Sequence, residues 1–416
     1  MPARIFGGVG RSSQSAIPVL RAAQCDVAIG SHITYSRASA GTRYTSAGLL
    51  ATMASGVPRI DYDPVSLAVR GLLIEEQRSN LLTYAEERDN AAWVTGGTSS
   101  VTANALTAPT GTTVADKLVE AAINNFHYQY QVQSVSASAR LVCTDHFKAV
   151  ERQWGCLEGF NGSTYPRGFF NLSTGAVGVS ADGATASLVS VGNGWHRCAI
   201  AWAMAAGTSA NVYALPANAN NSVFYAGDGV SGMGVFGGML EAATADYPHA
   251  TSYIPTVAAQ ATRAADDATI TGDAFTALYN AAAWGAFLRF RLTNAVGTRP
   301  VLSFDDNTAN NRIEIYASGT SLKLRVVTGG AQQCDTTIGT VAANTDYKLA
   351  ISQEGGAFLC TLNGAAEVSA SAASMPTVDR ARLGRNQAGS YLNGHLHTWD
   401  AYRRAVPVRE RLELTA

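Results

Sequence analysis

Alternating apolar and polar residues predict short β-strands throughout the C-terminal third of the chain. In the run RIEIYASGTSLKLRVV (312–327) the alternation continues on both sides of the turn signal SGTS, which predicts a half-buried hairpin. The apolar positions of this hairpin are Ile313, Ile315, Leu322, Leu324 and Val326. A second hairpin turns at EGGA, and its apolar positions are Tyr347, Leu349, Ile351, Phe358, Cys360 and Leu362. Regular short strands of this kind are typical of a β-sandwich, here 286–416, which ends in the helical run RERLELTA.

An earlier block shows the same alternation. FHYQYQV places Phe126, Tyr128 and Tyr130 on one face of a strand. WHRCAIAWAM has a strand face consisting of His196, Cys198, Ile200, Trp202 and Met204. Turn-rich stretches separate these runs, which predicts a second sandwich over 90–262 and a linker over 263–285. We therefore expect an all-β fold of two jelly-roll-like β-sandwich domains, preceded by an extended N-terminal anchoring segment (1–89) that takes its order from a neighbour.

Composition and charge narrow the classes of partner. The chain has 416 residues, of which only 15% are charged, and a net charge of −1. It has no dense block of Lys and Arg, so nucleic acid and anionic membranes are not expected partners. The first residues lack the apolar core of a secretory signal, and no run reaches the roughly 18 apolar residues of a membrane-spanning helix. We expect a protein made in the cytoplasm without a signal peptide and not inserted in a membrane.

Metal and cofactor sites are not predicted. The six cysteines show no CxxC pair and no zinc spacing, so we expect buried small side chains; whether Cys334 and Cys360 pair is left open. The run FDDNTANN (304–311), with Asp305, offers oxygen ligands for calcium but lacks the EF-hand spacing, which favours a solvated hairpin tip. His395 and His397 have no acidic or cysteine ligand at a recognisable spacing nearby, which favours an edge or core position.

No catalytic motif stands out, and we predict a protein that is not an enzyme. The chain has no GxSxG, no HExxH, no P-loop and no GxGxxG that opens a helix. Asp61 and Asp63 in RIDYDP lie two residues apart, as an acid pair would, but Asp before Pro is typical of a turn. A polysaccharide-degrading enzyme would need two convergent carboxylates. The best candidates for such a pair are Asp61, Asp63, Glu158 and Asp228, none of them in a motif.

Aromatic residues in turn-rich stretches are candidates for carbohydrate contact, because flat rings stack on sugar faces. These residues are Trp154, Tyr165, Trp195, Tyr225, Tyr391 and Trp399. Most of them are expected in the core. The loop EGFNGSTYPRG provides our predicted ligand-binding residues, Asn161, Tyr165 and Arg167.

The run RIDYDPVSLAVRGLLIEEQRSNLL (59–82) is informative as a whole. It resembles the stretch PR-x-DYDP … RGLLIEE-x-RTNLL of phage head spike and tail fibre proteins, and HITYSRASAGTRYTSAGLL (32–50) resembles the ITFSRASTATR run that precedes it. NAAWV, TAPTGTTVADKLVE and GGMLEAATADYPHATSYIPT look like the opening and closing parts of that family's carbohydrate-binding-module-like sandwich. The last domain is similar to concanavalin A-like or laminin-G-like sandwiches. Residues 1–31 match no such pattern.

The resemblance implies a structural protein on the exterior of a phage virion, attached to capsid or tail proteins through its N-terminal region and displaying its sandwiches to a host-surface glycan. Such proteins are symmetric oligomers, often trimers. The implied oligomer interface is a collar of Leu72, Leu73, Ile74, Glu75, Glu76, Arg78, Leu81 and Leu82. An ion pair within one chain is the alternative for the charged members. Alternative functions are a capsid decoration protein without a host ligand and a polysaccharide depolymerase.

Overall fold

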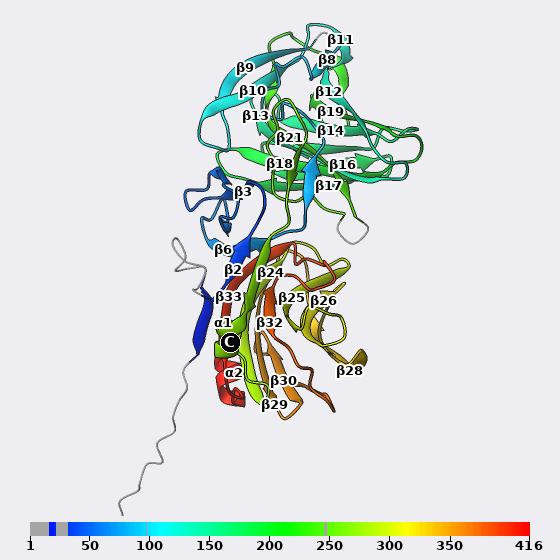
Figure 1. The fold of residues 1–416 in the computed structure, drawn as a ribbon. Helices are drawn as coiled ribbons and strands as arrows, with labels where there is room; N and C mark the ends of the chain where they lie inside the picture. The colour runs from blue at the N-terminus through cyan, green and yellow to red at the C-terminus, as the bar shows by residue number, and fades with distance from the viewer. Residues whose placement is uncertain (1–15, 22–31, 98, 245–247) are drawn as a thin grey trace, which may run out of the picture.

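The computed structural model describes residues 16–21, 32–97, 99–244 and 248–416. Two β-sandwiches lie one above the other in Figure 1, and the short helices are α1 (Gly272–Leu278) and α2 (Val408–Thr415). The predicted all-β class is confirmed, and α2 coincides with the helical run predicted at the C-terminus. Within the described ranges no helix has the length and hydropathy needed to cross a membrane.

The first sandwich consists of two six-stranded antiparallel sheets. One sheet has the order β17 (Thr185–Ser190), β18 (Trp195–Ala203), β13 (Arg140–Ala149), β21 (Gly232–Ala243), β10 (Thr113–Val119) and β9 (Ser100–Thr107). The facing sheet has the order β16 (Ala176–Ala181), β15 (Arg167–Asn171), β14 (Trp154–Phe160), β19 (Ser209–Ala217), β12 (Tyr128–Ser134) and β8 (Val94–Gly96). A separate pair is formed by β11 (Asn124–Phe126) and β20 (Phe224–Ala226). The alternation predicted for β18 is confirmed, because Cys198, Ile200 and Trp202 are all buried in the core between the sheets.

The second sandwich also has two antiparallel sheets. The larger has the order β31 (Val368–Ser371), β30 (Ala357–Leu362), β29 (Asp346–Glu354), β24 (Ala283–Leu292), β33 (Gly394–Tyr402), β6 (Val69–Ile74) and β5 (Ile60–Tyr62), and β1 (Ile17–Arg21) also pairs with β33. The other has the order β2 (Thr34–Ser36), β23 (Asp267–Thr271), β32 (Arg380–Leu383), β25 (Thr298–Asp305), β26 (Arg312–Ser318), β27 (Ser321–Thr328) and β28 (Ala331–Thr340). Two small ladders pair β3 (Gly41–Tyr44) with β4 (Leu50–Met53), and β7 (Arg78–Asn80) with β22 (Ala261–Arg263).

Both hairpins that the alternation predicts are present. They are β26–β27 and β29–β30, and the second turns through Gly355 and Gly356 with φ of +55° and +84°. Glycine adopts these left-handed angles without the steric cost that a Cβ adds. In this part of the chain, the alternation of apolar residues and the turn residues are therefore sufficient to predict both hairpins.

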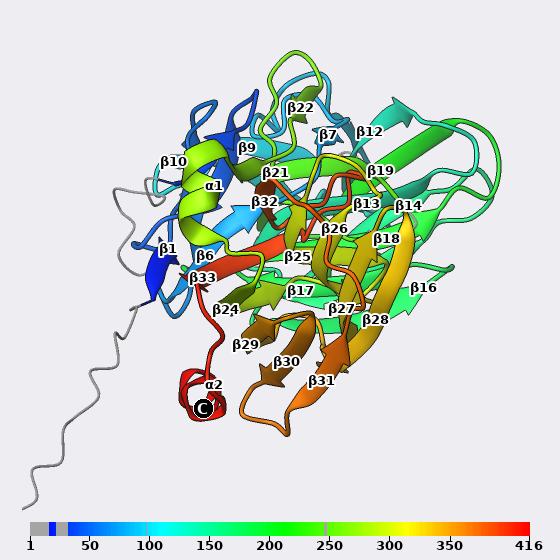
Figure 2. The ribbon, with the colours of Figure 1, turned by 60° about the horizontal axis from the view of Figure 1, so that its bottom comes forward.

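The N-terminal segment is not separate from the sandwiches, which differs from the predicted division at residues 89 and 263. Strands β1, β5 and β6 complete the larger sheet of the second sandwich, and β2 joins its other sheet. Figure 2 shows β1 beside β33, and α1 beside β32. The predicted linker 263–285 contains β23, α1 and the start of β24. The chain thus begins the second sandwich, builds the first, and returns to finish the second. Residues 1–15 and 22–31, where virion attachment was expected, lie outside the described part.

The residues of the predicted oligomer interface are buried or partly buried within one chain, which corrects that prediction. β6 lies between β33 and β5, so Leu72 and Ile74 pack in the second core, while Leu82 packs in the first. Arg78 donates to Glu76 with an Nε to Oε1 distance of 2.7 Å, which is the ion pair within one chain that the sequence left open. Of the predicted set, the residues that are buried are Leu72, Leu73, Ile74, Glu75, Arg78 and Leu82, and those that are partly buried are Glu76 and Leu81.

Five charged side chains meet between the two sandwiches and form a buried charge cluster: Arg37, Arg59, Glu75, Arg263 and Asp266. The three arginine side chains and Asp266 are 0% exposed, and Glu75 is 5% exposed. Arg59 lies 2.8 Å from Glu75 and 2.5 Å from Asp266, measured from its two Nη atoms to carboxylate oxygens. Arg37 Nη1 lies 3.3 Å from Asp266 Oδ1. Glu75 of the RGLLIEE motif therefore provides a negative charge that holds distant segments of the same chain together.

The ionisation of Glu75 follows from its surroundings. Burial alone raises the pKa of this carboxyl group, but Arg263, Arg59 and hydrogen bonds from Ser252 hold it well below its usual range. The Ser252 N–H and hydroxyl donate to Glu75 at 2.8 and 2.7 Å. Since Ser252 follows the last strand of the first sandwich and Glu75 follows a strand of the second, this contact joins the two.

Candidate functional site

The outer face of the sheet formed by β12, β19, β14 and β15 carries a cluster of aromatic rings. Along β19, Ala210, Val212 and Ala214 are buried in the first core, so Asn211 and Tyr213 lie on the outer side. The same alternation along the neighbouring strands, together with the loop between β14 and β15, completes the set. We call this surface the aromatic face and define it as Tyr128, Tyr130, Glu158, Phe160, Tyr165, Arg167, Asn211 and Tyr213.

The strand register places four of these residues in one row. Tyr130 pairs with Tyr213 between β12 and β19, and Tyr213 pairs with Glu158 between β19 and β14. Glu158 in turn pairs with Arg167 on β15. Directly opposed residues on one face of a sheet have Cβ atoms about 4.5–5.5 Å apart. The row therefore presents two phenol rings, a carboxyl group and a guanidinium group side by side.

The rings of the aromatic face form a continuous surface. Tyr130 and Tyr213 stack with centroids 5.1 Å apart and planes 22° apart. Tyr128 contacts Tyr213 edge-on at 5.5 Å. Tyr165 lies 6.3 Å from Tyr213 and 5.1 Å from Phe160. Such an arrangement offers flat apolar area next to phenol hydroxyl groups.

Polar groups border the rings. Asn211 Nδ2 donates to the Tyr213 hydroxyl at 2.8 Å. Arg167 Nε lies 3.2 Å from Glu158 Oε2, and Arg167 also approaches Asp182 at 3.9 Å. Burial raises the pKa of Glu158 to about 7, and Asp182 adds to this although Arg167 acts in the opposite direction. The face can therefore change its charge near neutral pH.

We expect Glu158→Gln to stabilise the protein at pH 8 by on the order of 2 kcal/mol and to have little effect at pH 5. In the folded protein the pKa of Glu158 is about 7, above the ordinary glutamate value of 4.5, so the wild type loses stability as the pH rises through that interval. Glutamine carries no charge at either pH and avoids this loss. Urea unfolding of both proteins at the two pH values measures the difference. An equal difference at pH 5 and pH 8 would contradict the raised pKa.

The three predicted ligand-binding residues have different positions. Tyr165 is 44% exposed and Arg167 is partly exposed, and both belong to the aromatic face. Asn161 differs from the prediction because it is only 7% exposed and its Oδ1 accepts the N–H groups of Ser163 and Thr164. Its side chain thus shapes the loop that carries Tyr165.

Two central residues of the face, Tyr130 and Tyr213, were not among the predicted ligand-binding residues. Tyrosine alternating with glutamine in YQYQ (128–131) was the available signal for Tyr130. Most of the other aromatic candidates are core residues, as expected: Trp195, Tyr225 and Trp399 are buried.

The four candidate carboxylates for hydrolysis occupy different surroundings. Asp61 Oδ2 and Nε2 of buried His395 lie 2.9 Å apart and share a hydrogen bond. Asp63 accepts the N–H groups that follow it in a turn, as predicted, and both it and Asp61 approach Arg70. Asp228 likewise accepts backbone N–H groups of its own turn. Glu158 lies on β14 of the first sandwich, whereas Asp61 lies on β5 of the second.

The candidate metal ligands and the cysteines do not form a metal site or a disulfide in the described part of the chain. Among the described residues, no group of three or more His, Cys, Asp or Glu side chains is arranged to hold a metal ion. Asp305 differs from the predicted solvated hairpin tip, because it is buried at the end of β25 and accepts a hydrogen bond from Arg382 of the neighbouring β32 at 2.9 Å. Cys334 and Cys360 are both free thiols, and Cys25 lies outside the described ranges.

The chain matches no protein-family model and no curated protein. Among solved structures, the CBM40 domain of the Ruminococcus gnavus IT-sialidase bound to α2,3-sialyllactose matches 34% of this chain and 87% of its own, with 14% identity and a TM-score of 0.31. NanB sialidase from Streptococcus pneumoniae matches 36% of this chain and 26% of its own, with 15% identity and a TM-score of 0.29. The binding domain of botulinum neurotoxin DC, in complex with rat synaptotagmin II, matches 36% of this chain and 40% of its own, with 10% identity and a TM-score of 0.30.

Proposed function

We propose that this protein is a non-enzymatic spike or fibre on the exterior of a phage virion and that its aromatic face binds a glycan of the host surface. The observation that carries the glycan proposal is the row of partly exposed tyrosine rings beside Glu158 and Arg167. A pyranose ring has an apolar face that stacks on such rings and hydroxyl groups that bond to the carboxyl and guanidinium groups. Exposed clusters of large apolar rings on a protein surface commonly mark binding sites.

The virion role is supported by the resemblance of 32–50 and 59–82 to phage spike and fibre proteins. The buried charge cluster gives those runs a physical purpose, because Arg37 comes from SRAS, Arg59 from RIDYDP and Glu75 from RGLLIEE. A protein exposed on a particle benefits from two sandwiches held together by interior contacts. We further propose a homo-oligomer, with a trimer as the first arrangement to test, because weak binding at one site becomes effective when several copies act together.

Binding of fluorescently labelled protein to host cells, with and without enzymatic removal of their surface polysaccharide, tests the proposal. We expect binding that disappears when the polysaccharide is removed. Binding to phage particles but not to cells would instead support a capsid decoration protein. Release of reducing ends from the polysaccharide would contradict the non-enzymatic role, and Glu158→Gln would then be the first variant to assay.

A further inference from the structure

The row of opposed residues that crosses the aromatic face continues beyond it on both sides. Val94 on β8 pairs with Tyr130, so it lies on the same face of the sheet at one end of the row. Ala181 on β16 pairs with Arg167 at the other end, and Asp182 follows it in the chain. Strands β8 and β16 are the two edge strands of this sheet. The row therefore crosses the sheet from one edge to the other.

A second, shorter row lies beside the first. Exposed Val132 pairs with Asn211, and Asn211 pairs with Phe160 on the next strand. The Tyr165 ring contacts Phe160 of the shorter row and Tyr213 of the longer one. The two rows therefore form a band of contacts that runs across the strands, with apolar side chains and polar groups along its length.

The length of this band suits several sugar units. Neighbouring strands lie about 4.8 Å apart, so the part of the row from Val94 to Arg167 extends over about 19 Å. One sugar ring with its glycosidic oxygen is about as long as a single strand spacing. The row therefore offers contacts to about four consecutive sugar units.

Both ends of the row are open to solvent. Val94 is 47% exposed at one end, and the Asp182 side chain is 42% exposed at the other. In the described part of the chain, this sheet has no strand beyond β8 or β16 that would close either end. A polymer can therefore pass over one edge of the sheet and leave over the other, which a site closed around a chain end would not allow.

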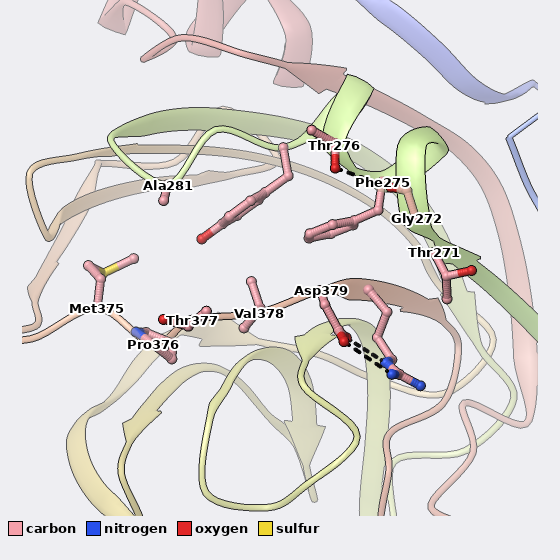
Figure 3. Close-up of a pocket in the computed structure, with 12 residues that line it drawn as sticks. Thr271, Gly272, Phe275, Thr276, Ala281, Met375, Pro376, Thr377, Val378 and Asp379 are labelled. Atoms are coloured by element: carbon pink, nitrogen blue, oxygen red, sulfur yellow. Dashed lines mark hydrogen bonds and ion pairs between the residues drawn. The ribbon is translucent and has the colours of Figure 1, made fainter.

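The second sandwich contains a more enclosed kind of site. A cavity of about 520 Å³ lies between α1 and the segment that precedes β32, and Figure 3 shows the Phe275 ring on its α1 side and Val378 on the opposite side. Cavities of about 300–1,000 Å³ are the usual size of small-molecule sites. The aromatic face differs, because all its residues except Tyr165 are strand positions on the surface of a sheet. It suits an extended ligand better than a single small one.

We infer that the aromatic face binds an internal stretch of a linear polysaccharide, about four sugar units long, which lies across the strands. The rings of Tyr130, Tyr165 and Tyr213 contact the apolar faces of neighbouring sugar units. Glu158 and Arg167 bond to hydroxyl groups of the units that follow. This inference rests on the proposed glycan binding and specifies which part of the glycan is recognised.

Isothermal titration calorimetry of the purified full-length chain tests the inference. The probes are fragments of the host polysaccharide made by partial acid hydrolysis and sized as single sugars, dimers, tetramers and hexamers. We expect the affinity to rise about three- to tenfold with each added unit up to the tetramer, and to change by less than about threefold from tetramer to hexamer. Chemical reduction of the end unit to its alditol should leave the affinity of the hexamer unchanged.

Val94→Asn tests the position of one end of the row. It replaces an exposed apolar side chain with a polar one, so we expect the tetramer to bind about threefold more weakly and the dimer to bind as it does to the wild type. Val189→Asn is the matched control, because Val189 is also exposed but lies on β17 of the facing sheet. It should leave the binding of every fragment unchanged. Both variants should keep the thermal midpoint of the wild type, because both side chains are exposed.

The possible failures are distinguishable. A dimer that binds as tightly as the hexamer, or a hexamer that loses its binding when its end unit is reduced, would overturn the inference while the proposed glycan binding stands. Equal effects of Val94→Asn and Val189→Asn on the tetramer would also overturn it. Absence of binding by every fragment and by the whole polysaccharide would overturn both this inference and the proposed glycan binding.

Discussion

Replacing Asp266 with alanine is expected to lower the free energy of unfolding by about 3–5 kcal/mol, because removing one partner of a buried ion pair leaves charge uncompensated. Asp266 contacts Arg37 and Arg59 at 3.3 and 2.5 Å and accepts the Glu75 N–H at 2.9 Å. Without it, Glu75 would face three buried arginines alone. Urea unfolding at pH 7, followed by tryptophan fluorescence, measures the loss.

Asp267→Ala is the matched control for that prediction. The neighbouring aspartate has a side chain that is 35% exposed and pairs with Arg385 at 2.6 Å. Partly exposed ion pairs of this kind contribute about 0–1 kcal/mol. Similar losses in the two variants would show that the charge cluster has no special importance for stability.

The double variant Tyr130→Ala, Tyr165→Ala is expected to weaken binding to purified host polysaccharide by up to about a hundredfold. A stacking contact of about 1.4 kcal/mol corresponds to tenfold in affinity, and each variant removes one ring from the aromatic face. Both rings are partly or largely exposed, so the first core should remain intact. Immobilised protein titrated with short soluble fragments of the polysaccharide gives the affinity of one site without the gain from multiple copies.

Phe224→Ala provides the control for adhesion. Phe224 is 52% exposed on β20, where it contacts Phe126 at 5.1 Å in a separate two-stranded sheet, and it is not a member of the aromatic face. Loss of this ring should leave polysaccharide binding unchanged. Equal loss in Phe224→Ala and in the double variant would mean that the binding surface is elsewhere on the sandwich or that binding is unspecific.

Strand β12 shows what alternation can and cannot predict. The sequence places Tyr128 and Tyr130 on one face, and this is correct, but the face that points outward is the aromatic one. Gln129 and Gln131 are buried instead, and they donate to the backbone carbonyl oxygens of Arg88 and Thr83. Period-two patterns identify which residues share a face. The buried partners that make a glutamine acceptable inside a core come from a different part of the chain.

The pairing of strands from distant segments could not be predicted from the sequence. Hairpins were predictable because both strands and their turn are adjacent, whereas β6 pairs with β33 through contacts such as Leu72 with Leu396. The RGLLIEE motif was visible, but its acids were assigned to contacts between subunits. The partners of Glu75 at Arg59 and Arg263 carry no local signal in the sequence.

Insertion of one sandwich within the other determines the order in which the protein can fold during translation. The strands of the first sandwich lie between Val94 and Ala243, so all of them are synthesised before β22 and the later strands that complete the second sandwich. β1 and β6 must wait for their partner β33 (Gly394–Tyr402), which is synthesised after every strand of the first sandwich. During this interval their unpaired edges are open to association with other chains. A chain that ends before β33 would therefore have one finished sandwich, while β1 and one edge of β6 would lack their partner strand.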